Sequence, residues 1–389
     1  MLSMDDVVLA DKRVMIREDY NVPLKEGKVA DDTRIKASLP TLQKALSSGA
    51  KILVVSHLGR PKEGEWEEKS SLAPVAECLQ SLVDAPVRFA RDWIEGAPLG
   101  KGTITLGENV RFLAGEGKDD PVLAQKLAAL CDVFVMDAFA TAHRAQASTH
   151  GVILKAPIAC AGPLFLAEVQ ALAKVMQNPE HPLVAVVGGA KVSTKMGVLE
   201  SLLSRVETLV VGGAMANTFL LAEGLPVGTS LAEKDKADDA RRILQRARNE
   251  KKNLLLPMDV IIGSSPEGDV VGVKNIGDVG PRDMILDIGP RTALAIAEEV
   301  ARARTILWNG PLGVIENPHF RSGTQTVAEA ISMSNAFSVA GGGETLEAIS
   351  LFGIADKLSY ISTAGGAFLE FIEGKTLPAI EALETKGKG

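Results

Sequence analysis

The chain has 389 residues, of which 46% are hydrophobic and 23% charged, a composition typical of a folded globular protein rather than a disordered one. This length exceeds the size at which one hydrophobic core usually stops growing, so we expect two domains. The formal net charge of -7 argues against nucleic acid as the main partner, because nucleic-acid-binding proteins usually carry a basic surface.

The amino-terminal segment MLSMDDVVLADKR contains acidic residues and no long apolar core. It therefore has the features of neither a signal peptide nor a transit peptide. No apolar run in the chain reaches the roughly 18 residues that a membrane helix needs. We expect a cytoplasmic protein that does not bind membranes.

Short apolar runs in the first half of the chain predict β-strands at residues 14–17, 51–56, 103–106 and 133–137. Helix-length segments separate the runs, which favours a parallel sheet covered on both faces. Polar or basic residues follow each run. They are Asp19 and Asn21 after the first run, the segment His57, Leu58, Gly59 and Arg60 after the second, Arg111 after the third and Arg144 after the fourth.

A further arginine, Arg34, stands in the first turn of a predicted helix that Asp32 or Thr33 can cap. The helix dipole disfavours a cation there, and a bound anion would remove the repulsion. Any one of these arginines can simply form a surface ion pair. Four of them close to successive strands indicate a small substrate with both carboxylate and phosphate groups, because guanidinium pairs with both in two parallel hydrogen bonds.

Residues 162–182 predict a single helix between two domains. Gly162 and Pro163 open the segment, Asn178 and Pro179 close it, and apolar side chains repeat at helical spacing between them. This helix can act as a hinge between the domains, or it can be one more packed helix.

The second half predicts strands at residues 183–187, 208–211, 305–308, 336–340 and 359–362, and each strand runs into a glycine-rich segment. The segments read GGAK, GGAM, NGPLG, GGGET and TAGGA. In a doubly wound sheet, ligands bind outside the carboxyl ends of the strands, where glycine lets the backbone approach phosphate groups. Five such endings in one domain predict a ligand crevice there.

Lys191 and Lys195 follow the first of these glycine pairs, and we expect both at the start of one helix. A spacing of four places two ammonium groups on one helix face near its positive end, which suits a polyphosphate. The alternative is a solvated lysine face.

Glu344 follows three glycines at the predicted start of another helix. It can favour the helix dipole, or it can bind a hard cation that bridges phosphate oxygens. Glu316 lies after the NGPLG segment and can accept hydrogen bonds from ribose hydroxyls, although such a residue is more often an ordinary surface carboxylate.

Common nucleotide and metal motifs are missing from the sequence. Gly374, Lys375 and Thr376 imitate the end of a P-loop, but Leu369 occupies the position where that loop needs a glycine. GxGxxG, HExxH and CxxC patterns do not occur either. A nicotinamide-dependent dehydrogenase on paired Rossmann folds is therefore disfavoured, and a non-catalytic binding protein would be expected to have lost site charges.

Taken in order, the segments REDYNVP, SHLGRP, ENVRF, TAHR, GGAKVSTK, VGGAMANTFL, WNGPLGVIE, AGGGET and STAGGAFLE resemble the phosphoglycerate kinase family over essentially the whole chain. The resemblance implies an α/β protein with two Rossmann-like parallel-sheet domains joined by a hinge helix, with the C-terminal tail packing back on the N-terminal domain. It implies a triose-substrate domain at 1–170 to which 371–389 return, a connecting helix at 171–182 and a nucleotide-binding domain at 183–370.

The implied reaction is Mg²⁺-dependent phosphoryl exchange between 1,3-bisphosphoglycerate with ADP and 3-phosphoglycerate with ATP, in a monomer. The implied triose-binding residues are Asp19, Asn21, Arg34, His57, Leu58, Gly59, Arg60, Arg111 and Arg144. The implied nucleotide-binding residues are Lys191, Lys195, Asn309, Glu316, Gly342, Gly343, Glu344 and Thr345. Arg34 and Lys195 are the candidates that neutralise the moving phosphoryl group, and Glu344 is the candidate metal ligand.

Two residues depart from the family pattern. Glu344 stands where the family commonly has aspartate, and Ala364 replaces the first glycine of the usual run. Neither change removes a charge from the implied site. The acceptor carboxylate is already ionised at neutral pH, so the chemistry needs positioning and charge neutralisation but no general base.

Overall fold

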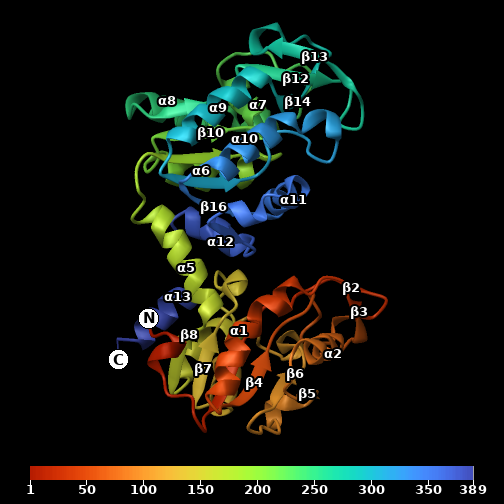
Figure 1. Ribbon diagram of the computed structural model, residues 1–389, viewed down its shortest axis with the longest axis vertical. Helices are drawn as coiled ribbons and strands as arrows, with labels where there is room; N and C mark the ends of the chain where they lie inside the picture. Colours follow the sequence, from red (N-terminus) through yellow and green to blue (C-terminus); the bar gives the residue numbers. More distant parts are fainter. Residues whose placement is uncertain (389) are drawn as a thin grey trace. The chain divides into compact units, whose positions relative to one another are not determined.

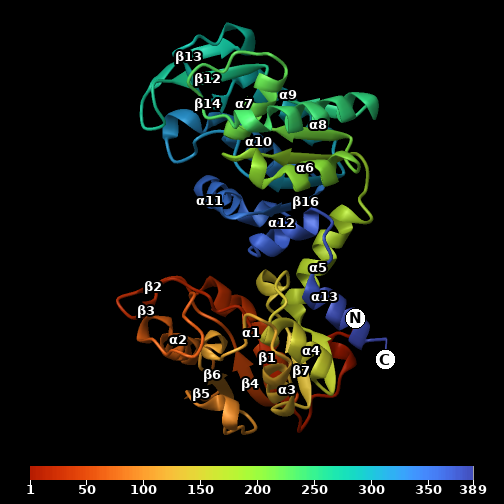
Figure 2. The ribbon, with the colours of Figure 1, turned by 180° about the vertical axis from the view of Figure 1, so that it is seen from behind.

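The computed structural model describes residues 1–388, which form two compact units (Figure 1). Unit 1 contains Met1–Gln170 and the segment from Thr376 onward, and unit 2 contains Ala171–Lys375. Each unit has its own parallel sheet with helices on both faces (Figures 1 and 2). The predicted α/β class with two Rossmann-like sheets is confirmed.

The sheet of unit 1 has the strand order β5-β6-β4-β1-β7-β8, and all neighbouring strands are parallel. Its strands are β1 (Arg13–Arg17), β4 (Lys51–Val55), β5 (Val87–Ala90), β6 (Ile104–Gly107), β7 (Val133–Met136) and β8 (Ile158–Ala161). The central strands are buried along almost their whole length, as expected where helices cover both faces of a sheet. A short hairpin of β2 (Leu24–Lys25) and β3 (Lys28–Val29) follows β1.

The helices of unit 1 bury their apolar faces on this sheet. They are α1 (Thr33–Ser47), α2 (Ala73–Leu82), α3 (Pro121–Ala129), α4 (Val152–Lys155) and the C-terminal α13 (Pro378–Lys386). In α1 the buried residues Ile35, Ser38, Leu42 and Ala45 recur at helical spacing. Asp32 is the N-cap residue of α1, but its side chain caps nothing; Asp31 accepts from the Thr33 backbone instead.

The C-terminal segment of the chain packs on unit 1, as predicted. Helix α13 contacts α4 and β8, and the Ala379 backbone N–H donates to the Ala142 carbonyl over 3.1 Å. The start of the chain lies beside the end of helix α13 in unit 1 (Figure 1). Helix α5 (Pro163–Met176) begins in unit 1 and continues past Gln170 into the residues of unit 2.

The sheet of unit 2 has the order β11-β10-β9-β15-β16-β17 and is also parallel throughout. Its strands are β9 (Leu183–Val187), β10 (Thr208–Val211), β11 (Asn253–Leu255), β15 (Thr305–Asn309), β16 (Phe337–Gly341) and β17 (Tyr360–Ser362). Counted along the chain, this is the third, second, first, fourth, fifth and sixth strand, which is the strand order of a Rossmann sheet.

Helices also cover both faces of this second sheet. They are α6 (Met196–Leu203), α7 (Gly213–Ala222), α8 (Ala237–Asn249), α9 (Pro290–Arg302), α10 (Ser322–Met333), α11 (Gly343–Phe352) and α12 (Gly366–Ile372). An antiparallel sheet of β12 (Asp259–Gly263), β13 (Val270–Asn275) and β14 (Met284–Ile288) packs against α7 and α9 at one end of the unit (Figure 2). The sequence did not predict this small sheet.

Over residues 1–388, none of the helices combines the length and the apolar character that a membrane crossing requires.

Candidate active site

In the sheet of unit 1, β1 and β7 are adjacent central strands. The strand of this sheet that follows β1 in the sequence, β4, lies on one side of this pair, and the strand that follows β7, β8, lies on the other side. A ligand crevice is expected outside the carboxyl ends of such a strand pair. Asp19 follows β1 there, and its Oδ2 accepts a 2.6 Å hydrogen bond from Arg34 Nη1. Arg34 Nη1 also approaches the Asn21 carbonyl at 3.3 Å. Asp19, two residues beyond the end of β1, therefore holds Arg34 of helix α1 near this end of the strand.

Asn21 connects the Asp19–Arg34 pair to the loop after β4. Its Oδ1 accepts from the Gly59 backbone N–H over 2.8 Å, and Arg111 donates to the Gly59 carbonyl. Leu58 is 4% exposed and packs in the core, so only its backbone is available at the site. Asp19, Asn21, Arg34, Gly59 and Arg111 thus form one connected cluster, although they come from four different segments of the sequence.

Arg60, Arg111 and Arg144 line a cavity of about 370 Å³ in unit 1, together with Pro61, Glu63, Gly117 and Gln146. Partial burial, followed by repulsion from Arg144 and Arg17, lowers the pKa of Arg111 to about 10. Such crowding of cations is unfavourable without an anion between them. The cavity is therefore suited to a phosphate or carboxylate group.

In unit 2 the chain moves outward in opposite directions from β9 and β15. The loops after these strands touch through their backbones: a Cβ on Gly188 would stand 1.9 Å from the Pro311 carbonyl oxygen. Gly310 has φ +101°, a conformation that favours glycine. The glycines predicted from the sequence are required here by close approach of two loops.

Lys195 lies across this loop pair. Its Nζ donates to the Gly188 carbonyl over 2.6 Å and to the Asn309 carbonyl over 3.2 Å. Burial lowers the pKa of Lys195 to about 8, and the charge of Glu344 opposes part of that shift. The ammonium group is therefore held at the carboxyl ends of β9 and β15, close to Gly189.

The prediction that Lys191 and Lys195 share one face of an α-helix is wrong. Residues Val192–Thr194 form a 3₁₀ turn, α6 begins only at Met196, and Lys195 is its N-cap residue. The side chain of Lys195 turns inward to the two carbonyls, whereas Lys191 is exposed. The reason is that glutamate and carbonyl acceptors hold this loop: Glu233 accepts from Ser193 N–H over 2.8 Å.

Thr345 and Asn309 hold the glycine turn after β16. The Thr345 hydroxyl accepts from the Gly310 backbone N–H over 2.7 Å and donates to the Gly341 carbonyl over 2.8 Å. Asn309 Nδ2 donates to the same carbonyl over 2.6 Å. Both side chains are buried, so they position the loops that surround the crevice. Gly342, with φ +101°, is the N-cap residue of helix α11.

Replacing Thr345 by valine, which has the same shape, is expected to lower the free energy of unfolding by about 1–3 kcal/mol, because it leaves the Gly310 N–H buried without a partner. Urea denaturation followed by circular dichroism measures the change. Thr345→Ser retains the hydroxyl and is the matched control. Equal stability of the valine variant and the wild type would contradict the role of this hydroxyl.

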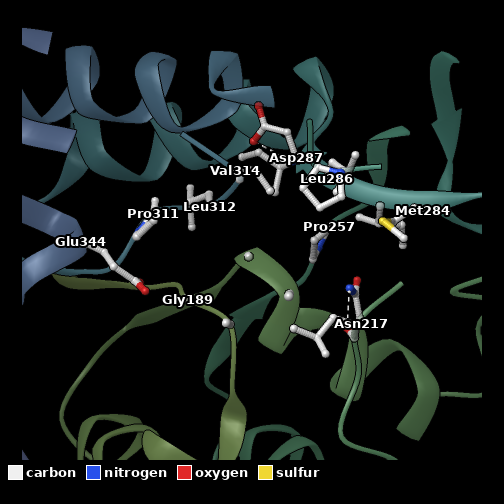
Figure 3. Close-up of a pocket in the computed structure, with 18 of the residues that line it drawn as sticks. Gly189, Asn217, Pro257, Met284, Leu286, Asp287, Pro311, Leu312, Val314 and Glu344 are labelled. Carbon is white, nitrogen blue, oxygen red and sulfur yellow. Dashed lines mark hydrogen bonds between the residues drawn. The ribbon is translucent and has the colours of Figure 1, made fainter. Parts of the chain in front are cut away.

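A cavity of about 250 Å³ extends from this crevice within unit 2 (Figure 3). Glu344 lies at one side of it beside Gly189 and Pro311, and Met284, Leu286 and Asn217 lie on the other side (Figure 3). Glu316 also lines it. An apolar slot with polar groups at one end is the usual form of a small-molecule site. The sequence did not predict the contributions of Asn217, Leu231, Met284 and Leu286.

The family model for phosphoglycerate kinase matches residues 4–375. The chain belongs to the phosphoglycerate kinase family. The chain is similar to the structure of phosphoglycerate kinase from Coxiella burnetii, with a TM-score of 0.96 and 50% sequence identity. The match covers 100% of this chain and 99% of the Coxiella burnetii chain. The crystal structure of phosphoglycerate kinase from Pyrococcus horikoshii OT3 has a TM-score of 0.83 at 33% identity, with both chains covered to 100%.

Membership in the phosphoglycerate kinase family makes the chain a kinase with a carboxyl group as acceptor, and a glycolytic enzyme. The family also explains why two crevices with different chemistry occur in one chain. A kinase must hold a phosphate donor and an acceptor, and each crevice presents groups that favour anions.

Within residues 1–388, no group of three or more His, Cys, Asp or Glu side chains could hold a metal ion. Glu344 is a single exposed carboxylate at the start of α11 that lines the unit 2 cavity. This arrangement fits Mg²⁺, which is usually bound through substrate phosphates and one or two carboxylates rather than by a protein cage.

Proposed function

We propose that this chain catalyses reversible Mg²⁺-dependent transfer of a phosphoryl group between 1,3-bisphosphoglycerate with ADP and 3-phosphoglycerate with ATP. The observation that carries the proposal is the pair of crevices, each at the central strand pair of its own parallel sheet. One is lined by arginines, and the other is formed by glycine turns and a half-buried lysine. The first suits a small acid with a phosphate group, and the second suits a nucleotide.

The triose acid is assigned to residues 1–170, through Asp19, Asn21, Arg34, His57, Gly59, Arg60, Arg111 and Arg144. A cluster of guanidinium groups supplies the paired donors that a carboxylate and a phosphate accept. Asp19 orients Arg34 through its 2.6 Å hydrogen bond. Leu58 contributes through its backbone alone, since its side chain is in the core.

The nucleotide is assigned to residues 183–370. The 250 Å³ cavity accepts the base and ribose, and Glu316 is placed to accept from ribose hydroxyls. Lys191, Lys195 and the backbone of Gly342 and Gly343 receive the phosphates. Asn309 and Thr345 hold the surrounding loops. Glu344 would hold Mg²⁺, which would supply positive charge to neutralise the nucleotide phosphates.

The chain's own residues have two tasks in the transfer. Arg34 and Lys195 neutralise charge that spreads over the moving phosphoryl group, and the remaining groups hold donor and acceptor in line. No residue needs to remove a proton, because the acceptor carboxylate is ionised. Since each ligand is assigned to a different unit, closure about the segment 171–182 is part of the proposal, and it would also exclude water.

The proposal includes a monomer that acts in the cytoplasm, as expected from the sequence.

A coupled assay tests the proposal. The purified protein, ATP, 3-phosphoglycerate and Mg²⁺ are expected to produce acyl phosphate, and omission of 3-phosphoglycerate or addition of a chelator is expected to stop it. Absence of turnover with all components present would sink the proposal. Binding of reduced nicotinamide, detected by fluorescence, in place of turnover would instead favour the dehydrogenase hypothesis.

A further inference from the structure

Unit 1 contains a buried guanidinium group, that of Arg17, close to the arginine cluster of the candidate site. Arg17, the last residue of β1, is 1% exposed. Its Nε donates to Ser148 Oγ over 3.0 Å, and its Nη1 donates to the Glu18 carbonyl over 2.5 Å. Its Nη2 stands 3.3 Å from His57 Nδ1. Every nitrogen of this guanidinium therefore has a neighbour inside the protein.

The charge of Arg17 is compensated by a second buried group, Glu116, which is 1% exposed. The Glu116 carboxylate accepts from the Ser148 backbone N–H over 3.0 Å and from the Ser148 hydroxyl. The Ser148 hydroxyl thus donates to Glu116 and accepts from Arg17. Glu116 therefore holds Ser148, Ser148 holds Nε of Arg17, and Nη2 of the guanidinium faces the imidazole.

The contact at His57 determines which ring nitrogen carries the proton. Arginine has N–H donors and no acceptor, so a ring nitrogen that faces it must offer its lone pair. Nδ1 is therefore unprotonated, and in the neutral ring the proton is on Nε2. The competing partner of Nδ1 is Asp19 Oδ1, but its distance of 3.8 Å is too long for a hydrogen bond.

Charges around the ring favour its neutral form. Burial is the largest cause that lowers the pKa of His57 well below its ordinary value, and Arg17, Arg111, Arg144 and Arg34 add to the effect. They face the ring from β1, from the loops after β6 and β7, and from α1. Asp19 is the carboxylate that faces Nδ1, at 3.8 Å. Among residues 1–388, the ring makes its only hydrogen bond through Nδ1.

We propose that Arg17 is a positioning residue that holds His57 as the neutral tautomer with its proton on Nε2, so that the ring donates a hydrogen bond to the triose anion. The choice of ligand rests on the proposed function, whereas the tautomer does not. A neutral donor among four arginines keeps the charge of the site constant over the pH range of about 5 to 8, in which an ordinary histidine changes its charge.

The first test needs no substrate. The chain has five histidines, so a long-range ¹H–¹⁵N spectrum of the labelled protein can be assigned with His57→Gln as reference. We expect His57 to show a pyridine-type Nδ1 and a pyrrole-type Nε2 throughout the range of about pH 5 to 8. A proton on Nδ1, or titration of this ring near its ordinary pKa, would overturn the proposal without any variant of Arg17.

The second test removes the contact. Arg17→Met alone leaves Glu116 as an uncompensated buried charge, so the double variant Arg17→Met/Glu116→Gln is used, with Glu116→Gln alone as the matched control. In the double variant the His57 ring is expected to populate the Nδ1-protonated form, which can turn to Asp19. The KM for 3-phosphoglycerate is expected to rise roughly tenfold at pH 8, as one oriented hydrogen bond to an anion is lost.

The pH profile separates positioning from mere loss of structure. In the double variant the Arg17 charge no longer lowers the pKa of His57, so this pKa is expected to rise, although burial and the other three arginines still lower it. The phosphate of the substrate titrates in the same range, so the KM of each variant is divided by that of the Glu116→Gln control, and this ratio is expected to fall for the double variant as the pH falls. For Arg17→Lys, which restores a donor toward Nδ1, the ratio is expected to stay constant, and a constant ratio in the double variant would contradict the proposal.

Failure of this inference is distinguishable from failure of the proposed function. If the wild-type protein shows the expected tautomer but does not turn over 3-phosphoglycerate, the role of Arg17 on His57 stands and the choice of ligand is wrong. If turnover occurs and the proton is on Nδ1, the inference about Arg17 is wrong and the proposed function stands.

Discussion

Replacing Arg34 by alanine is expected to lower kcat by at least about two orders of magnitude, as for other groups that stabilise charge in a transition state. Arg34 is the second residue of α1, whose first turn contains no acidic residue to offset the helix dipole. The side chain is 35% exposed, and its anchor is Asp19. A cation that is held there by one carboxylate still has donors available for a ligand.

The reason to expect an effect on kcat rather than on KM is that the triose anion retains Arg60, Arg111 and Arg144 when Arg34 is removed. An interaction made mainly in the transition state lowers kcat and kcat/KM together. Steady-state kinetics with 3-phosphoglycerate and MgATP measures both values. Loss of Arg34 that only raises KM would make it a binding residue and remove it from the transfer step.

Lys36 provides the matched control on the same helix. It is 56% exposed and forms a 2.9 Å ion pair with Asp32 four residues earlier. An exposed ion pair of this kind contributes little to stability. Lys36→Ala therefore removes one positive charge near Arg34 without removing a site residue, and its kcat is expected to stay close to that of the wild type. A comparable loss in both variants would indicate a general charge effect.

The central strands of both sheets could be predicted because they are apolar on both faces and are followed by polar or glycine-rich segments. Among the strands that were not predicted, β12 is buried throughout, whereas β5, β8 and β13 lack that pattern. In β5 the two middle residues, Arg88 and Phe89, are exposed at the sheet edge, and β8 is built largely of small residues with weak strand preference. In β13, Val271 and Val273 face solvent at 65% and 54% exposure. In β5 and β13, therefore, burial on two faces is absent, and this burial is what made the central strands predictable.

The predicted site residues were those that follow strands, since the carboxyl ends of parallel strands meet at one edge. Arg17, Glu116 and Ser148 escaped prediction, because a charged residue inside a strand or loop gives no sign of being buried. Their association joins positions 131 and 32 residues apart. The inward position of the Lys195 side chain was not predicted for the same reason, because one of its acceptors, the Asn309 carbonyl, lies 114 residues away in the sequence. Such contacts follow from the topology of the sheet, which the order of the motifs alone does not give.

Lys195 leads to the second large expected effect, a dependence of nucleotide affinity on pH. Burial lowers its pKa to about 8, so the ammonium form loses its proton as the pH rises through that value. Above about pH 8 each further unit leaves roughly tenfold less of the charged form. The affinity for ADP is therefore expected to fall as the pH rises from about 8, by up to tenfold per unit.

The free energy of unfolding should rise with pH while the affinity for ADP falls. This difference separates weaker nucleotide binding from unfolding of the protein. The folded pKa of about 8 lies below the ordinary value of 10.5, so the unfolded chain binds more protons in the window between them. The contribution of Lys195 to the free energy of unfolding therefore rises as the pH increases from about 8 to 10.5. Weaker binding with an equal or higher urea midpoint is the expected combination.

Calorimetry gives the direct measurement. A bound polyphosphate favours the ammonium form, so ADP binding near pH 8 is expected to take up a fraction of one proton, which appears as a binding enthalpy that depends on the buffer. Lys195→Met should abolish the uptake, and Lys195→Arg, which stays charged, should bind ADP without it. Lys191→Met is the matched control, since Lys191 lies exposed in the same loop. Unaltered proton uptake in Lys195→Met would mean that another group titrates, and it would contradict the assignment of the half-buried Lys195 ammonium to the nucleotide phosphates.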